Sequence, residues 1–316
     1  MMVGMEAMAK AASEFLVSLR PDQRGAVSMP DDDPDRHEWT YLPGARPGLP
    51  VEELSAEQRG LLDELVRAGS GEERVALGAI GVERARRTLV LGAEPDSDKY
   101  WVRIGGTPGD ARWSWRINGH HLAEHVEVRD GRYTVTPHFI GAEPARLPAA
   151  AAGLPAGHRL LAPEEDLARA LLAALDPDQR AVAVPGDVAP DDILTRFDPV
   201  ADPSVLPSGI ARRDLDGTQR EIVDRLLRRY LGRAPADYAA ACWRELETAG
   251  LDELEFAWLG PLAPGEGHYY CLRGQTLLIE YDNTQDDANH AHSVWRHLRD
   301  DWGGDALREH YDEQHR

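Results

Sequence analysis

Histidines, which suit both metal binding and proton transfer, gather in two segments of this sequence. The chain has 12 histidines in 316 residues. One segment reads GHHLAEH over 119–125, and the other is NHAH over 289–292, shortly after IEYDN over 279–283. Imidazole and carboxylate groups are common ligands of zinc, iron, manganese and copper, and they transfer protons near neutral pH. The candidate chemistry of the chain therefore lies in these two segments.

The spacing of His290 and His292 bears on whether they can share an ion. In an extended segment both rings project to one side, whereas on a regular helix they would lie about 200° apart. A second interpretation needs no metal. Asn289 or Ser293 could cap a helix that covers VWRHLRDDW, and the polar residues before it could form a turn.

The sequence predicts a site for a divalent transition metal, with zinc, iron or copper as the candidates. Its expected ligands are His121, Glu280, His290 and His292, and its expected acid–base or supporting groups are His120 and Asp282. If 119–129 is a strand, His121 and His125 share a face. Aligning Gly119 with Gly274 then places Glu280 at the position of His125. The alternative is that one or more of these histidines only fill the core.

A helix start that recurs four times indicates how the chain is organised. It reads SLRPDQR over 18–24, ELSAEQR over 53–59, ALDPDQR over 174–180 and DLDGTQR over 214–220. In the last three, Ser55, Asp176 and Asp216 are natural N-caps, and a glutamine follows each of them at capping-box spacing. In sequence order the four starts form two pairs.

The strand regions repeat in the same order, since 100–122 can be aligned with 255–277. We therefore expect an internally duplicated α+β protein, with an antiparallel sheet flanked by helices and pseudo-twofold halves. The halves are 1–150 and 158–316, the second carries the Glu/His segment, and together they form one compact unit. The connector is the Ala- and Pro-rich stretch 142–157.

Hydrophobic period and turn residues predict the individual elements. Helices are expected near 5–19, 54–68, 73–90, 164–175, 191–196, 217–231 and 234–249. Strands are expected near 100–105, 112–117, 119–129, 132–138, 255–260, 268–273 and 275–282. The dipeptides Asn118-Gly119 and Asp130-Gly131 predict hairpin turns.

Composition excludes several classes of function. A net charge of −20 disfavours nucleic acid and anionic membrane surfaces as partners. The sequence lacks an apolar run of about 20 residues and a convincing signal peptide, so a cytoplasmic protein is expected. Its two cysteines, Cys242 and Cys271, do not form a CxxC pair, and it contains neither a GxSxG elbow nor a phosphate-binding P-loop.

Four segments carry a resemblance to a known family. They are WSWRINGHHL over 113–122, TPHFIGAEPA over 136–145, EYDNTQDDANHAHSVWR over 280–296 and DWGGDALREHY over 301–311. With them the chain resembles domain-of-unknown-function family 3500 over nearly its whole length. The resemblance implies no established reaction. It directs attention to the candidate residues inside the family-like segments, which are His120, His121, Glu280, His290 and His292.

The function that these observations favour is a metal-dependent enzyme acting on a small molecule. Hydrolysis is preferred, because a cation held by histidine and carboxylate ligands activates water at neutral pH. One alternative is a redox enzyme that uses iron or copper and oxygen. The other is a non-catalytic protein that binds a small molecule or a metal.

Overall fold

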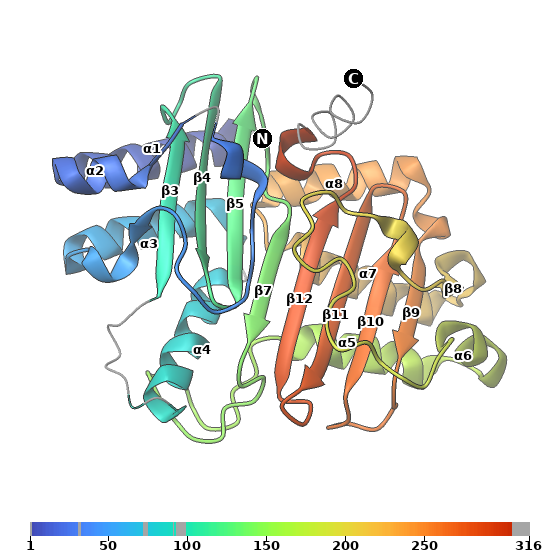
Figure 1. The fold of residues 1–316 in the computed structure, drawn as a ribbon. Helices are drawn as coiled ribbons and strands as arrows, with labels where there is room; N and C mark the ends of the chain where they lie inside the picture. The colour runs from blue at the N-terminus through green and yellow to red at the C-terminus, as the bar shows by residue number, and fades with distance from the viewer. Residues whose placement is uncertain (1, 31–32, 72–74, 91, 93–98, 305–316) are drawn as a thin grey trace.

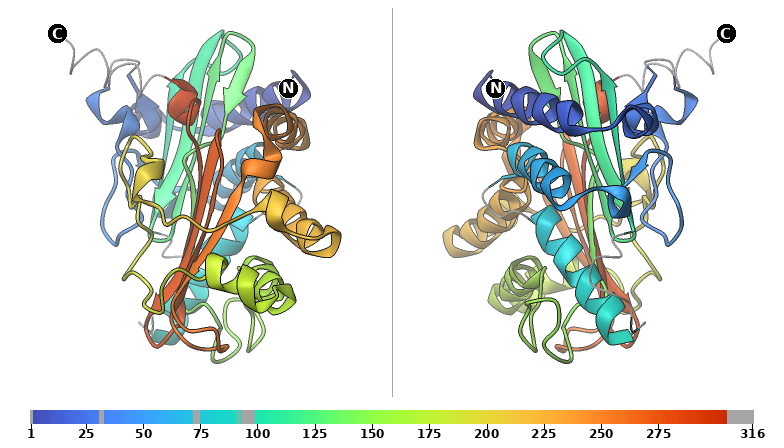
Figure 2. Two further views of the ribbon diagram at one scale, coloured as in Figure 1. Left: turned by 90° about the vertical axis from the view of Figure 1, so that its right-hand side faces the viewer. Right: turned by 90° about the vertical axis from the view of Figure 1, so that its left-hand side faces the viewer.

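The computed structural model describes residues 2–30, 33–71, 75–90, 92 and 99–304. In this part of the chain, twelve strands form one open mixed sheet and eight α-helices accompany it (Figure 1). The helices gather on one face of the sheet, and two long loops, 33–48 and 184–209, cross the other (Figure 2). We call these the helix face and the loop face.

The helices lie in two groups of four. They are α1 (Met2–Ser18), α2 (Pro21–Val27), α3 (Ala56–Gly69) and α4 (Val75–Val90), then α5 (Ala162–Ala174), α6 (Pro177–Ala183), α7 (Gly217–Leu231) and α8 (Ala236–Ala249). None of the described helices is long and apolar enough to cross a membrane.

The first half of the chain contributes β1 (Ser28–Met29), β2 (Leu49–Pro50), β3 (Tyr100–Gly106), β4 (Arg112–Gly119), β5 (Leu122–Arg129), β6 (Arg132–Thr134) and β7 (His138–Ala142). The second half contributes β8 (Ile210–Ala211), β9 (Glu255–Leu259), β10 (His268–Arg273), β11 (Leu277–Gln285) and β12 (His290–His297). The main path of the sheet is β1-β3-β4-β5-β7-β12-β11-β10-β9-β8. Strands β7 and β12 therefore join the halves at the centre.

Capping boxes form at the helix starts that the sequence predicted. Ser55, Asp176 and Asp216 each accept a hydrogen bond from the backbone N–H of the glutamine three positions later. The glutamines also pair between helices. Gln23 and Gln58 exchange amide hydrogen bonds in the first half, and Gln179 and Gln219 do so in the second.

Replacing Gln58 with alanine should lower the free energy of unfolding by about 2 kcal/mol, because a buried amide pair and a capping box are lost together. Gln58 also donates to the carbonyl of Ser18, so the change removes a link between α1 and α3. The matched change Gln179→Ala should cost less, because Gln179 is only half-buried whereas Gln58 is buried. Urea unfolding of both variants measures the difference, and equal losses would contradict this account of the pair.

The loop face carries a small aromatic and aliphatic core of its own. It consists of Trp39, Tyr41, Ala123, Phe139, Ile193, Val294 and Trp302. Tyr41 comes from the first loop and Ile193 from the second, so both loops are packed onto the central strands. The rings of Tyr41 and Phe139 stack with centroids 4.1 Å apart. This packing holds irregular backbone close to the junction of β7 and β12.

The structure corrects several predictions. The segment 191–196 forms turns rather than a helix. Asn118 and Gly119 lie within β4, and His120 and His121 form the turn instead. The single strand expected over 132–138 is divided, because β6 ends at Thr134 and β7 begins at His138. The sheet is mixed rather than purely antiparallel, since β1 runs parallel to β3.

Other features agree with the sequence. The helices over 54–68 and 217–231, the strands over 100–105 and 268–273, and the turn at Asp130-Gly131 are confirmed. The start of the helix expected at 73 and the family-like residues after 304 lie outside the described residues. The internal duplication stays a prediction.

Candidate metal centre

A two-residue turn between β4 and β5 positions the first histidine of the site. Gly119 pairs with Leu122, which leaves His120 and His121 as the turn. His121 adopts a φ of +62°, a left-handed conformation that histidine adopts more readily than most residues. Its N–H donates to the carbonyl of Tyr41 (3.2 Å), and its carbonyl accepts from the N–H of Gly141 on β7 (2.8 Å). The turn is therefore held to the first loop and to the central strands.

Gly141 provides the space for the imidazole ring of His121. A Cβ atom at position 141 would lie 2.6 Å from Cδ2 and 2.8 Å from Cγ of that ring. Any larger residue would push the ring away, so glycine at 141 is part of the site.

The other two histidines come from β12, which pairs with β7 on one side and β11 on the other. His290 and His292 alternate along the extended strand, so their side chains project to the same face. His292 lies opposite Gly141 of β7 and Asp282 of β11. The site therefore forms where the two halves of the sheet meet.

The three imidazole rings converge through their Nε2 atoms. The Nε2 atom of His121 lies 2.8 Å from Nε2 of His290 and 3.3 Å from Nε2 of His292. The three ring planes are inclined to one another by 56–83°. Ligands at the zinc–nitrogen distance of about 2.0–2.1 Å in a tetrahedron stand about 3.3–3.4 Å apart. The separation between His121 and His292 matches this spacing, and the separation between His121 and His290 is shorter than it, as in a hydrogen bond.

Carboxylates hold the outer nitrogen of two of these rings. Asp192 Oδ1 lies 2.7 Å from Nδ1 of His292, and Asp286 Oδ2 lies 2.9 Å from Nδ1 of His290. The other oxygen of Asp192 accepts from the hydroxyl of Tyr41 (2.9 Å). A carboxylate at Nδ1 favours the tautomer with hydrogen on Nδ1 and a free electron pair on Nε2. That tautomer is the one that binds metals through Nε2.

Burial disfavours a positive charge on two of the three histidines. It lowers the pKa of His121 well below the ordinary value, and His120, His292 and His290 lower it further. Burial also lowers the pKa of His290, despite the opposing carboxylate of Asp286. The Nε2 atoms of His121 and His290 lie at hydrogen-bond distance, so without a cation one ring can donate to the other. A neutral imidazole is also the form that binds a metal ion.

His120 belongs to a second group of polar side chains, which lies beside the three histidines. Its ring stacks on His121 with centroids 3.7 Å apart, and its Nδ1 lies 3.2 Å from Glu83 of α4. Arg86 forms ion pairs with both Glu83 and Glu143. This salt-bridged group supports the histidine turn from the helix face.

Asp282 lies close to His292 and Asp192. One carboxylate oxygen of Asp282, one of Asp192 and a ring nitrogen of His292 all lie within 4.8 Å of one another. Its oxygens accept hydrogen bonds from the hydroxyl of Thr284. Burial raises the pKa of Asp282 to about 8, and the nearby charge of Asp192 adds to the shift. A carboxyl group with a raised pKa is a candidate proton donor.

Two residues that the sequence placed at or beside the site, Glu280 and His125, lie away from the three histidines. Glu280 is buried on β11, where its carboxylate accepts hydrogen bonds from Leu194, Thr195 and Tyr269 rather than facing the histidines. His125 stacks on Trp302 with centroids 4.2 Å apart, away from the cluster. The face shared by His121 and His125 does not exist, because His121 belongs to the turn and precedes the strand.

Sequence reasoning missed Asp192, Asp286, Tyr41 and Glu83. Asp286 lies inside one of the family-like segments, so its place three residues before NHAH was a usable signal. Asp192 carried no such signal, because the segment around it, 191–196, was predicted to be a helix.

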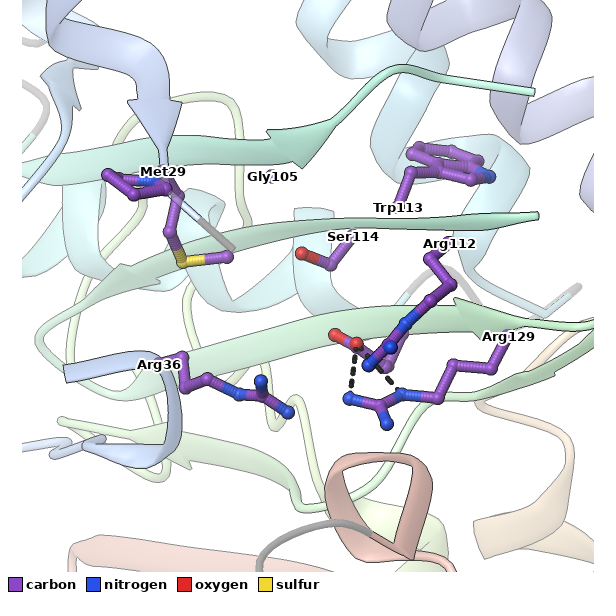
Figure 3. Close-up of a pocket in the computed structure, with 9 residues that line it drawn as sticks. Met29, Arg36, Gly105, Arg112, Trp113, Ser114 and Arg129 are labelled. Carbon is purple, nitrogen blue, oxygen red and sulfur yellow. Dashed lines mark hydrogen bonds and ion pairs between the residues drawn. The ribbon is translucent and has the colours of Figure 1, made fainter. Parts of the chain in front are cut away.

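A separate cavity of about 240 Å³ lies at the opposite end of the β4–β5 hairpin (Figure 3). Arg36, Arg112, Ser114 and Arg129 line it, and Arg129 pairs with Glu127. None of its lining residues belongs to the histidine cluster.

The described residues define an α/β protein with an open mixed sheet and buried groups of histidines and carboxylates that could hold a metal ion. The chain belongs to the family described as "Protein of unknown function (DUF3500)", whose family model matches residues 2–304. No curated protein and no solved structure matches the chain.

Proposed function

We propose that this protein is a metal-dependent enzyme that acts on a small molecule, with hydrolysis as its chemistry. The observation that carries the proposal is the convergence of three buried imidazoles through Nε2, two of them held by carboxylates at Nδ1. His121, His290 and His292 are the proposed ligands.

The donor set favours zinc. Three neutral imidazoles with a fourth position open to water form a recurrent catalytic zinc site. Neither cysteine belongs to the groups found among the described residues, so a softer, sulfur-bound metal has no support there. A bound zinc ion would supply Lewis acidity that activates water near neutral pH.

The neighbouring residues have distinct proposed roles. Asp192 and Asp286 orient the rings of His292 and His290. Asp282, whose carboxylate lies within 4.8 Å of His292 and Asp192, is the proposed acid–base group. His120, between Glu83 and Glu143, links the site to two carboxylates and Arg86. Glu280 is not retained as a ligand.

We also propose that the halves are two copies of one unit. The strand order β3-β4-β5-β7 is followed by β12-β11-β10-β9, which is the order that a twofold axis between β7 and β12 would produce. The paired glutamines recur at equivalent helix starts in each half. Under this proposal the metal site arose at the junction, from a hairpin of one copy and a strand of the other.

Removal of the metal should abolish activity while leaving the fold intact. We expect chelation to lower the melting temperature by only a few degrees, equivalent to about 1–2 kcal/mol, because the sheet and helices supply the core. Thermal melting with and without chelator, beside hydrolysis of an activated ester such as p-nitrophenyl acetate, measures both effects. Unfolding of the metal-free protein would mean that the ion is structural.

A further inference from the structure

The buried carboxylate of Glu280 faces the loop 184–209 rather than the histidines. Glu280 is fully buried, and its two oxygens accept four hydrogen bonds. Two come from the backbone N–H groups of Leu194 and Thr195, one from the Thr195 hydroxyl and one from the Tyr269 hydroxyl, at 2.8 Å. Burial raises the pKa of Glu280, and the hydrogen bonds from Thr195, Tyr269 and Leu194 oppose that rise.

The loop segment held by Glu280 includes the carboxylate that contacts a proposed ligand. Asp192 lies two residues before Leu194, and its Oδ1 atom is 2.7 Å from Nδ1 of His292. On the sheet, Glu280 pairs with Val294 and Asp282 with His292, so Glu280 and His292 belong to neighbouring rungs of the same strand pair. Glu280, which holds the loop, and His292, the proposed ligand, therefore lie on one pair of hydrogen-bonded strands, β11 and β12.

We propose that Glu280 is a positioning residue that fixes Asp192 against His292 and thereby sets the orientation of that ring. This inference rests on the proposed function, because it assigns a role within the proposed metal site. The segment 191–196 contains no regular helix or strand, so contacts to other parts of the chain hold it. The carboxylate of Asp192 accepts from the N–H of Ile193 (2.7 Å) and from the hydroxyl of Tyr41 (2.9 Å). The backbone is held on one side of Asp192 by Gln285, which donates to the carbonyl of Asp191, and on the other side by Glu280.

The first test is the zinc affinity of full-length variants, measured by competition with a chelator. Glu280→Gln replaces one oxygen with an NH₂ group that cannot accept from Leu194 or Thr195. Thr195→Val removes one donor and leaves Glu280 ionisable, so it provides a milder second variant. We expect Glu280→Gln to weaken zinc binding about 10- to 100-fold, the usual effect of losing a group that supports a metal ligand.

The route through Asp192 is tested by a double-mutant cycle. In an Asp192→Ala background, Glu280→Gln should weaken zinc binding no further, because the group that it positions is already absent. Additive losses would overturn the proposal. Glu124→Gln is the matched control, since Glu124 is another buried carboxyl group, bonded to Ser70 and outside the groups around the site, and zinc affinity should not change.

A second measurement does not depend on metal. In metal-free protein, ¹⁵N NMR of the imidazoles should show His292 with its hydrogen on Nδ1, and Glu280→Gln should shift it toward a mixture of tautomers. An unchanged tautomer in this variant would overturn the proposal. If zinc does not bind to the wild type but the tautomer responds as expected, the proposed function fails and the positioning role stands.

Discussion

Replacing His292 with alanine should weaken metal binding roughly 100- to 1000-fold, because four-ligand zinc sites contribute about 10–16 kcal/mol in total and one ligand is lost. His121→Ala and His290→Ala should have similar effects, since a ligand atom of each of the three histidines lies within 4.8 Å of the other two. Isothermal titration of zinc into chelator-treated protein measures the change.

The matched control is His268→Ala. His268 is also buried, but it stacks on Trp258 and contacts Glu165, outside the cluster. Its loss should cost stability and leave zinc affinity within about twofold, because it supplies no ligand atom. If His292→Ala binds zinc as tightly as the wild type, the three histidines are core residues and the proposed function has no support.

Replacing Gly141 with alanine should weaken zinc binding by about 10- to 100-fold, the range found when a group that orients a metal ligand is disturbed. The added methyl group would approach the His121 ring to 2.6 Å, so the ring must move out of its place in the cluster. The backbone of Gly141 does not require glycine, since its φ is not in the left-handed region. The effect should therefore be steric and confined to the site.

Gly60→Ala is the control for that change. Gly60 lies on α3, and nothing stands within 4 Å of the place where its Cβ would be. This variant should be neutral or slightly more stable, because alanine favours a helix by up to about 1 kcal/mol, and its zinc affinity should not change. If the Gly141→Ala variant binds zinc as tightly as the wild type, zinc binding does not require the present position of the His121 ring.

The sequence was most informative where local chemistry determines structure. Capping boxes at Ser55, Asp176 and Asp216 formed as predicted, because a cap and its glutamine are only three residues apart. The two histidine segments were also found from their residue types. The structure brings His121, His290 and His292 together although about 170 residues separate the turn from β12.

The misplaced residues show where local reasoning fails. Asn118-Gly119 has the composition of a hairpin turn, but the register of β4 against β5 places the turn one residue pair later, at His120 and His121. His121 thereby becomes a turn residue with a φ of +62°, so the alternation of the strand does not extend to it. The expected grouping of His121, His125 and Glu280 does not form for that reason.

Glu280 and Asp192 illustrate a second limit. A buried carboxylate near histidines resembles a ligand in sequence, but its hydrogen-bond donors come from a loop more than 80 residues away. Asp192 reaches His292 from that same loop across 100 residues. Contacts between irregular segments and distant strands depend on tertiary packing, which hydrophobic period does not encode.

The central claim is that this protein binds a transition metal through His121, His290 and His292, and elemental analysis of tag-free protein tests it most directly. The account predicts about one equivalent of metal per chain, with zinc expected for three neutral imidazoles, and little or none in His292→Ala. Wild-type protein that contains no stoichiometric transition metal, and that takes up neither zinc, iron nor copper on reconstitution, would contradict it.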